Sequence, residues 1–188
     1  MSLVLNSSGG GSVTIEEPVT AANVTQTLAP VAGTLAPIVS DTAVTASGTA
    51  VNFTGIPSWV KRITVMINGL SYAAAGQGVV QIGSGSLTTT GYTSVSTGLP
   101  NTAQTIVTSA TNGFAGLGTT GAAVTLHSIF VLYNVSGNLW CFEQKTNRSD
   151  LVGSFSNGSI TLGGVLDRLS LVATTSTFDA GTVNIFYE

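Results

Sequence analysis

Charged side chains are scarce in this sequence. Asp, Glu, Lys and Arg together make up 7% of the 188 residues, whereas soluble domains ordinarily contain about 25%. Strong helix formers such as Glu, Lys and Arg are therefore rare, which argues against a helical fold. The net charge is −3, and the five basic residues are dispersed along the chain. Because nucleic-acid binding depends on clustered Lys and Arg, we expect no DNA or RNA partner.

Histidine and cysteine are almost absent. His127 is the sole histidine and Cys141 the sole cysteine, so one chain can form neither a disulfide nor a His/Cys metal cluster. His127 lies in a strand-like apolar run, where we expect a half-buried packing residue rather than a metal ligand or the base of a catalytic triad. A three-fold axis could still bring three copies of His127 together. We predict no metal and no other cofactor.

Motifs of the common enzymes are also missing. The sequence contains no G-x-S-x-G elbow, no glycine-rich phosphate loop followed by lysine and no H-E-x-x-H pair. Asp150, Asp167 and Asp179 could supply oxygen ligands for calcium or the carboxylates of a glycosidase, but their spacing matches no calcium loop. We expect each to be a solvated turn residue, and we predict that the protein has no catalytic residues and is not an enzyme.

Long apolar runs are absent, although the mean hydropathy is +0.44. The longest uninterrupted run, Ile129 to Tyr133, is far shorter than the ~20 residues of a membrane-spanning helix. We therefore expect no membrane insertion. The N-terminal residues lack the basic region and the apolar core of a signal peptide, so we expect synthesis and assembly in a cytoplasm. A hydropathic chain with few charges must cover apolar surface, and oligomer formation is the simplest way to do so.

Glycine, serine, threonine and the other β-branched residues are abundant, which is typical of strands and tight turns. Residues 1–40 contain a Gly-rich opening, three prolines and two short β-like pieces, Val13 to Glu16 and Val24 to Leu28. Residues 41–188 contain longer strand-like runs separated by turn dipeptides. This layout predicts an extended N-terminal segment followed by an all-β, antiparallel sandwich or barrel domain.

Two strands stand out in the second part. Lys61 to Asn68 alternates, with Ile63, Val65 and Ile67 on one face, and should end in a turn at Asn68-Gly69. Val124 to Val135 is apolar on both faces, so we expect a central strand covered on two sides, with a neighbouring subunit as one of the covers.

Later segments predict a meander and a closing strand. We expect Ser136-Gly-Asn138 to form a hairpin turn between the strand at Val124–Val135 and a strand at Leu139–Glu143. We expect Asn157-Gly158 to form a second hairpin turn, between strands at Leu151–Phe155 and Ser159–Leu162. Two alternating runs follow, and the last one is expected to tie the C-terminus into a sheet. These two runs are Leu166 to Ala173 and Thr182 to Tyr187.

Residues 83–117 are rich in Ser, Thr and Gly, which favours long loops at one edge of the domain. Tyr92 lies in this region, and Tyr72 follows the predicted turn at Asn68-Gly69. Exposed loop tyrosines stack on sugars or anchor interfaces, so Tyr72 and Tyr92 are our candidate surface-contact residues, with a host surface glycan as one partner and a neighbouring subunit as the alternative.

The N-terminal segment carries a resemblance to a known group of proteins. Residues 11–30 approach the form G-x-V-T-[IL]-x-x-P-x-x-[AS]-x-x-x-T-x-T-L-P, except that Ala29 separates Leu28 from Pro30. This segment resembles a module of tail-fibre and related appendage proteins of tailed bacteriophages, and Thr177 to Glu188 is similar to the closing strand of small viral structural proteins. The resemblance implies a homotrimer with an N-terminal attachment segment, a jelly-roll-like β-sandwich head and no cofactor.

These observations leave three hypotheses for a virion protein. The first is a short homotrimeric tail or head fibre that contacts the host surface, because 40 residues are too few for a long stalk. The second is a capsid decoration protein that stabilises the head, and the third, with the least support, is a polysaccharide-processing enzyme. The partners are other copies of the chain and other virion proteins. The candidate assembly or attachment residues are Val13, Ile15, Leu28, Ile129 and Val131.

Overall fold

The computed structural model describes residues 3–6, 9–10, 12–15, 38–100 and 106–188. The chain divides into two compact units, Met1–Leu35 and Ala36–Glu188. Regular structure in the described residues consists of β-strands, and every strand pair is antiparallel. No helix that could span a membrane is found in these residues.

The first unit contains one small sheet. Strand β1 (Leu3–Asn6) pairs with β2 (Ser12–Ile15), and Leu5 lies opposite Val13. Strand β2 confirms most of the short strand that we predicted from Val13 onward, whereas the predicted strand from Val24 to Leu28 lies outside the described residues. The expected boundary at residue 40 is too late, because β3 (Val39–Ser40) already pairs with a strand of the second unit.

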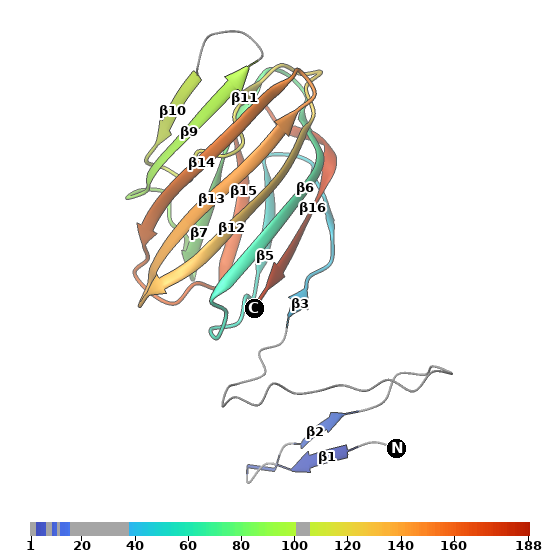
Figure 1. Cartoon of the computed structure of the whole chain (residues 1–188), viewed down its shortest axis with the longest axis vertical. Helices are drawn as coiled ribbons and strands as arrows, with labels where there is room; N and C mark the ends of the chain where they lie inside the picture. The colour runs from blue at the N-terminus through green and yellow to red at the C-terminus, as the bar shows by residue number, and fades with distance from the viewer. Residues whose placement is uncertain (1–2, 7–8, 11, 16–37, 101–105) are drawn as a thin grey trace, which may run out of the picture. The chain divides into compact units, whose positions relative to one another are not determined.

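The second unit is a sandwich of two sheets (Figure 1). The larger, nine-stranded sheet has the order β10-β9-β14-β13-β12-β6-β16-β3, with β4 also paired to β16. Besides β3, its strands are β4 (Val44–Thr45), β6 (Arg62–Tyr72), β9 (Thr93–Pro100), β10 (Ile106–Ala110), β12 (Leu126–Ser136), β13 (Leu139–Arg148), β14 (Val152–Thr161) and β16 (Phe178–Tyr187).

The smaller sheet lies behind the larger one in Figure 1. It has five strands in the order β11-β7-β15-β5, with β8 also paired to β7. Its strands are β5 (Ala50–Thr54), β7 (Gly76–Ser84), β8 (Ser86–Leu87), β11 (Thr119–Thr120) and β15 (Arg168–Thr175). The predicted all-β antiparallel sandwich is therefore confirmed, and the jelly-roll connectivity stays a prediction.

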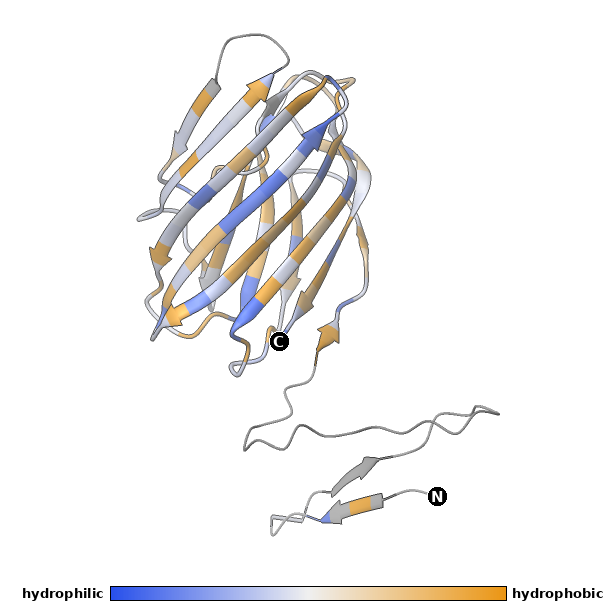
Figure 2. Ribbon diagram, in the orientation of Figure 1, coloured by the Kyte–Doolittle hydropathy of each residue, from blue (hydrophilic) through white to orange (hydrophobic). Residues whose placement is uncertain are grey.

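Alternating side chains build the core between the two sheets. Ile63, Val65 and Ile67 of β6 are buried, as their period-2 spacing predicted. The closing strand is also confirmed, because β16 lies between β6 and the short strands β3 and β4 and buries Val183 and Ile185. The alternation of polar and apolar residues along the strands can be followed in Figure 2.

An aromatic cluster connects the two sheets. Phe114 lies outside the named strands, and its backbone exchanges two hydrogen bonds with Val80 of β7, of 3.0 and 2.7 Å. Its ring stacks on Phe142 of β13, with the ring centroids 4.6 Å apart and the planes 6° from parallel. Phe130 of β12 packs against Phe142 in turn. Backbone pairing with one sheet and ring stacking on the other fix the spacing between them.

The turn that we predicted at Asn68-Gly69 is wrong. Strand β6 continues through these residues to Tyr72, and the pairing register with β12 shifts between Leu126 and Ser128. Gly69 has φ +65°, a conformation that glycine adopts without steric cost. The dipeptide therefore forms a β-bulge, which interrupts the ladder without reversing the chain.

The predicted hairpins have mixed outcomes. Strands β12 and β13 form the expected hairpin, with Gly137 at φ +54°. The hairpin at Asn157-Gly158 is wrong, because β14 runs through both residues without a break. The chain instead reverses before β14, at residues 149–151, where Leu151 has φ +65°. Hydrogen-bonded neighbours on both sides of β14 hold the Asn-Gly dipeptide extended.

The long loops expected over residues 83–117 are wrong in part. Strands β8, β9 and β10 lie in this region, and β10 is the edge strand of the larger sheet, whereas residues 88–92 and 111–117 lie outside the named strands. Thr and Ser are compatible with strands when a neighbouring strand supplies the backbone partners, as β14 does for β9.

We predict that Gly158 is needed for its lack of a side chain. A Cβ at this position would lie 2.6 Å from the carbonyl oxygen of Thr93 and 2.9 Å from the Phe114 ring. Gly158→Ala should therefore lower the free energy of unfolding by about 1–3 kcal/mol through overpacking, as measured by urea denaturation.

Gly153 of the same strand is the matched control, because a Cβ there meets nothing within 4 Å. Gly153→Ala should be neutral or stabilising by up to about 1 kcal/mol. Equal unfolding midpoints for the two variants would contradict the role of Gly158.

Candidate functional site

Tyr72 is not the surface residue that we predicted. Its side chain is 0% exposed, its hydroxyl donates a hydrogen bond to the Leu117 carbonyl at 3.2 Å, and its ring packs 5.2 Å from Phe178. Because β6 continues beyond the bulge at Gly69, Tyr72 is a strand residue that points into the core. Burial raises the pKa of the Tyr72 phenol above its usual range.

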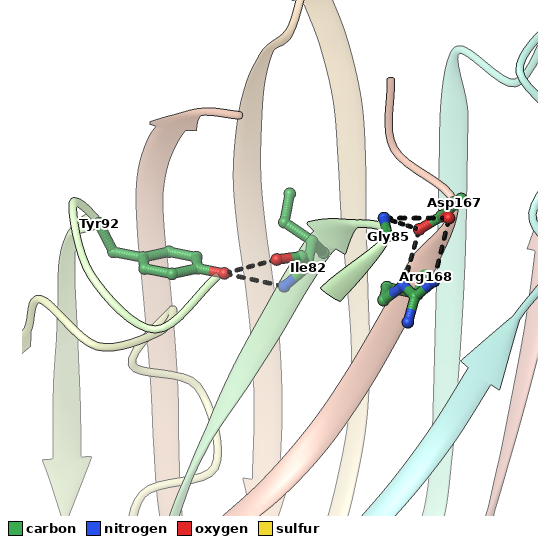
Figure 3. Close-up of polar contacts among 5 residues, drawn as sticks. All are labelled: Ile82, Gly85, Tyr92, Asp167 and Arg168. Atoms are coloured by element: carbon green, nitrogen blue, oxygen red, sulfur yellow. Dashed lines mark hydrogen bonds and ion pairs between the residues drawn. The ribbon is translucent and has the colours of Figure 1, made fainter. Parts of the chain in front are cut away.

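Tyr92 is also buried, with 2% exposure, so our prediction of a surface contact is wrong here too. Its hydroxyl accepts a hydrogen bond from the Ile82 N–H at 2.8 Å and donates one to the Ile82 carbonyl at 3.1 Å (Figure 3). Its ring meets Phe114 edge to face, with the centroids 4.9 Å apart. These hydrogen bonds hold the residue just before β9 against β7. Because the side chain is buried, it cannot contact a sugar at the surface.

The candidate assembly residues lie in different places. Ile129 and Val131 are on the surface of the larger sheet that points away from the core, where Ile129 is 48% exposed. Val13 and Ile15 are on β2, and Leu28 lies outside the described residues. Strand β12 buries the face with Leu126, Phe130 and Leu132 in the core, and the neighbouring subunit that we expected over its other face stays a prediction.

We call the surface of the larger sheet that points away from the core the outer face. Strand register places its side chains in rows that cross the strands, and two neighbouring rows form its centre. One row contains Met66, Ile129, Lys145, Phe155 and Thr97. The next row contains Thr64, Val131, Glu143, Asn157 and Val95.

A shallow groove lies in the centre of the outer face. It has a volume of about 370 Å³ and is lined by Ile129, Val131, Glu143, Lys145 and Phe155 among others. A second hollow of about 480 Å³ continues from it toward His127 and shares Ile129, Lys145 and Phe155 with the first. Phe155 is 52% exposed at the rim of both. The groove is thus an apolar surface with one charge of each sign.

Lys145 and Glu143 have no ion-pair partner among the described residues. The ion pairs that the described residues form join Arg62 with Glu188, Arg148 with Asp150 and Arg168 with Asp167. Lys145 and Glu143 are two residues apart on β13 and point to the same side. Ile129 and Phe155 flank Lys145, and Val131 and Asn157 flank Glu143. Both charges are therefore exposed, and each has at least one apolar neighbour on an adjacent strand.

The candidate polar residues do not come together. His127 is exposed at one end of the outer face, not half-buried as expected. Asp150 pairs with Arg148, and Asp179 accepts a hydrogen bond from the Ser71 hydroxyl. No group of three or more His, Cys, Asp or Glu side chains within the described ranges could hold a metal ion.

Asp167 directly precedes β15 of the smaller sheet and binds its neighbours there. Its carboxylate accepts hydrogen bonds from the Gly85 N–H at 3.1 Å and from Nε of Arg168 at 2.8 Å (Figure 3). The hydrogen bond from Arg168 is the main reason that the pKa of this carboxyl lies below its usual range. Asp167 therefore orders the connection between β7 and β8.

Comparison of the chain with protein-family models, with curated proteins and with solved structures finds no match. The outer face was missed in the sequence as a single surface, although Ile129 and Val131 belong to it. The pairing register of β12, β13 and β14 is what places Phe155, Lys145 and Glu143 beside Ile129 and Val131. The period-2 pattern of β13, which sends Glu143 and Lys145 outward together, was the available signal.

We predict that removal of the Tyr92 hydroxyl lowers stability. Tyr92→Phe deprives the buried Ile82 N–H of its acceptor, so the free energy of unfolding should fall by about 1–3 kcal/mol. The control is Tyr187→Phe at the partly exposed end of β16. The Tyr187 hydroxyl has no hydrogen-bond partner in the described part of the chain, so the loss should stay below about 0.5 kcal/mol.

The same residue should make stability depend on alkaline pH. Burial raises the pKa of Tyr92 from 10.0 to about 12, so between these values the unfolded chain releases the phenol proton and the folded chain keeps it. The free energy of unfolding should therefore fall as the pH rises from 10 to 12. Urea denaturation across this range should show a shallower decline for Tyr92→Phe, and an unchanged decline would contradict the assignment.

Proposed function

We propose that this protein is a non-enzymatic structural protein of a bacteriophage particle, which assembles with copies of itself into a short external fibre or appendage. The observation that carries the proposal is the outer face, where Ile129, Tyr133, Val135 and Phe155 are exposed large apolar side chains. Apolar surface of this extent is typical of protein interfaces. A chain with 7% charged residues has few means of keeping such a surface soluble.

The N-terminal unit supports an attachment role. Its described strands form a two-stranded sheet, β1 with β2, and an isolated two-stranded hairpin is marginally stable in water. Such a segment gains stability when it pairs with other chains. We assign residues 1–35 to attachment and to the homotrimer that the phage resemblance implies, and the sandwich to the head.

The distribution of polar groups supports a structural role more than a catalytic one. His127 lies on the outer face, whereas Asp167 is held by Arg168 and Asp179 by Ser71. Catalysis requires an acid, a base or a nucleophile within hydrogen-bond reach of the others. A host glycan remains a proposed partner of the fibre, but its site must use residues other than Tyr72 and Tyr92.

We expect antibodies against this chain to label the outside of purified particles of the virus that encodes it. Electron microscopy with gold-labelled antibody measures the position directly. Label on a tail or on projections supports the fibre, and label spread over the shell supports the capsid decoration protein instead. Particles that carry no label and lack the chain by mass spectrometry would overturn the proposed function.

Deletion separates the fibre from the decoration protein. For a fibre, removal of residues 1–35 should release the protein from particles and leave the capsids as resistant to heat as before. For a decoration protein, particles that lack the whole chain should burst at lower temperature, because subunits bridged by it lose a stabilising contact. Release of DNA during a temperature ramp measures the difference.

A further inference from the structure

We infer that the outer face binds the outer face of a second copy of this chain, with Lys145 of each copy opposite Glu143 of the other. This inference rests on the proposed function, since it names the surface through which heads of the self-assembling protein meet. It assigns to Glu143, Lys145 and Phe155 a role that none of them received from the sequence.

The size of the outer face fits such a contact. Five adjacent strands, β6, β12, β13, β14 and β9, contribute to it. With strands about 4.8 Å apart and about 30 Å long, the surface measures about 700 Å². A stable protein interface buries about 800 Å² of each partner. The area of the outer face is therefore close to the area that each partner of a stable interface buries, so a second copy would have to cover nearly the whole face.

Charge complementarity points to a second copy as the occupant. Burial of a lone lysine or a lone glutamate is costly unless an opposite charge meets it. A partner must therefore present a negative group over Lys145 and a positive group over Glu143. The outer face itself carries this pair, on one strand and at successive outward positions, so a copy of the chain satisfies both charges at once.

The register shows how the two copies would lie. A two-fold axis in the interface, crossing β13 at right angles between Glu143 and Lys145, turns the second copy end for end. Each lysine then lies over a glutamate. Because Ile129 is level with Lys145 and Val131 with Glu143, the same rotation places Ile129 of one copy over Val131 of the other. The charged pairs and the apolar contacts are satisfied by one arrangement.

This contact joins chains in twos. It produces a dimer, or a pair of trimers where residues 1–35 hold three chains together. Cys141 lies one outward position beyond Glu143 on the same strand and is partly exposed. Its thiol therefore becomes less accessible when the two faces meet, which provides a reporter within the natural sequence.

The test is sedimentation of the full-length chain over a range of concentrations, with four variants. The wild-type protein should sediment as an oligomer with an even number of chains. Lys145→Glu and Glu143→Lys should each raise the dissociation constant about tenfold or more, because each places like charges opposite one another. The double variant restores the opposite charges and should return to within about threefold of the wild type.

Lys61→Glu is the matched control. Lys61 is exposed and its amine donates a hydrogen bond to Asn134, so the same charge reversal occurs away from the centre of the outer face. This variant should leave association unchanged. Urea unfolding of all variants checks that each is folded. Alkylation of the Cys141 thiol should slow as the concentration of the wild type rises and the chains associate. At the same concentrations, alkylation of Lys145→Glu should stay fast.

The outcomes are decisive for the surface. A wild type that forms only trimers or only monomers overturns the face-to-face contact, as do single variants that match Lys61→Glu or a double variant that fails to recover. The proposed function stands or falls separately on the labelling of virus particles. An oligomer with unchanged association in the single variants would leave that function intact and place the contact elsewhere.

Discussion

Phe114 joins the two sheets of the sandwich, and much of the remaining structure is arranged around it. Its backbone pairs with Val80 of the smaller sheet, and its ring stacks on Phe142 of the larger sheet. Tyr92 packs edge-on against the same ring and is held by Ile82. Gly158 has no side chain where the ring passes. The position of this one ring thus constrains residues from four separate parts of the chain.

The shortage of charge has a consequence for the surface. In a sandwich, each strand of the larger sheet sends alternate side chains into the core and out to the solvent, so the outward positions determine how the protein meets water. Here many of those positions hold apolar residues such as Ile129 and Phe155, with Lys145 and Glu143 between them. A surface of this kind is better suited to another protein surface than to solvent, which is the basis of both proposals.

Sequence patterns predicted strands well and turns poorly. The alternation of Ile63, Val65 and Ile67 indicates a buried face because side-chain direction along a strand is a local property. Asn-Gly dipeptides are compatible with a turn, a bulge or a strand, and the neighbouring strands decide between them. At residues 68–69 the outcome is a bulge, and at residues 157–158 it is a continuous strand. The burial of Tyr72 and Tyr92 follows from the same long-range pairing.

The sequence by itself determined the all-β class, the principal strands and the C-terminal strand, because composition and period-2 patterns act over a few residues. Apart from the β12–β13 hairpin, only the tertiary structure decided which strands are neighbours, and with that the outer face. Ile129, Lys145 and Phe155 lie on the consecutive strands β12, β13 and β14, and they are side by side in space because these strands pair in one register. The turn signal at residues 136–138 predicts that β12 and β13 pair, but the exact register and the outer neighbours β6 and β9 depend on the whole core.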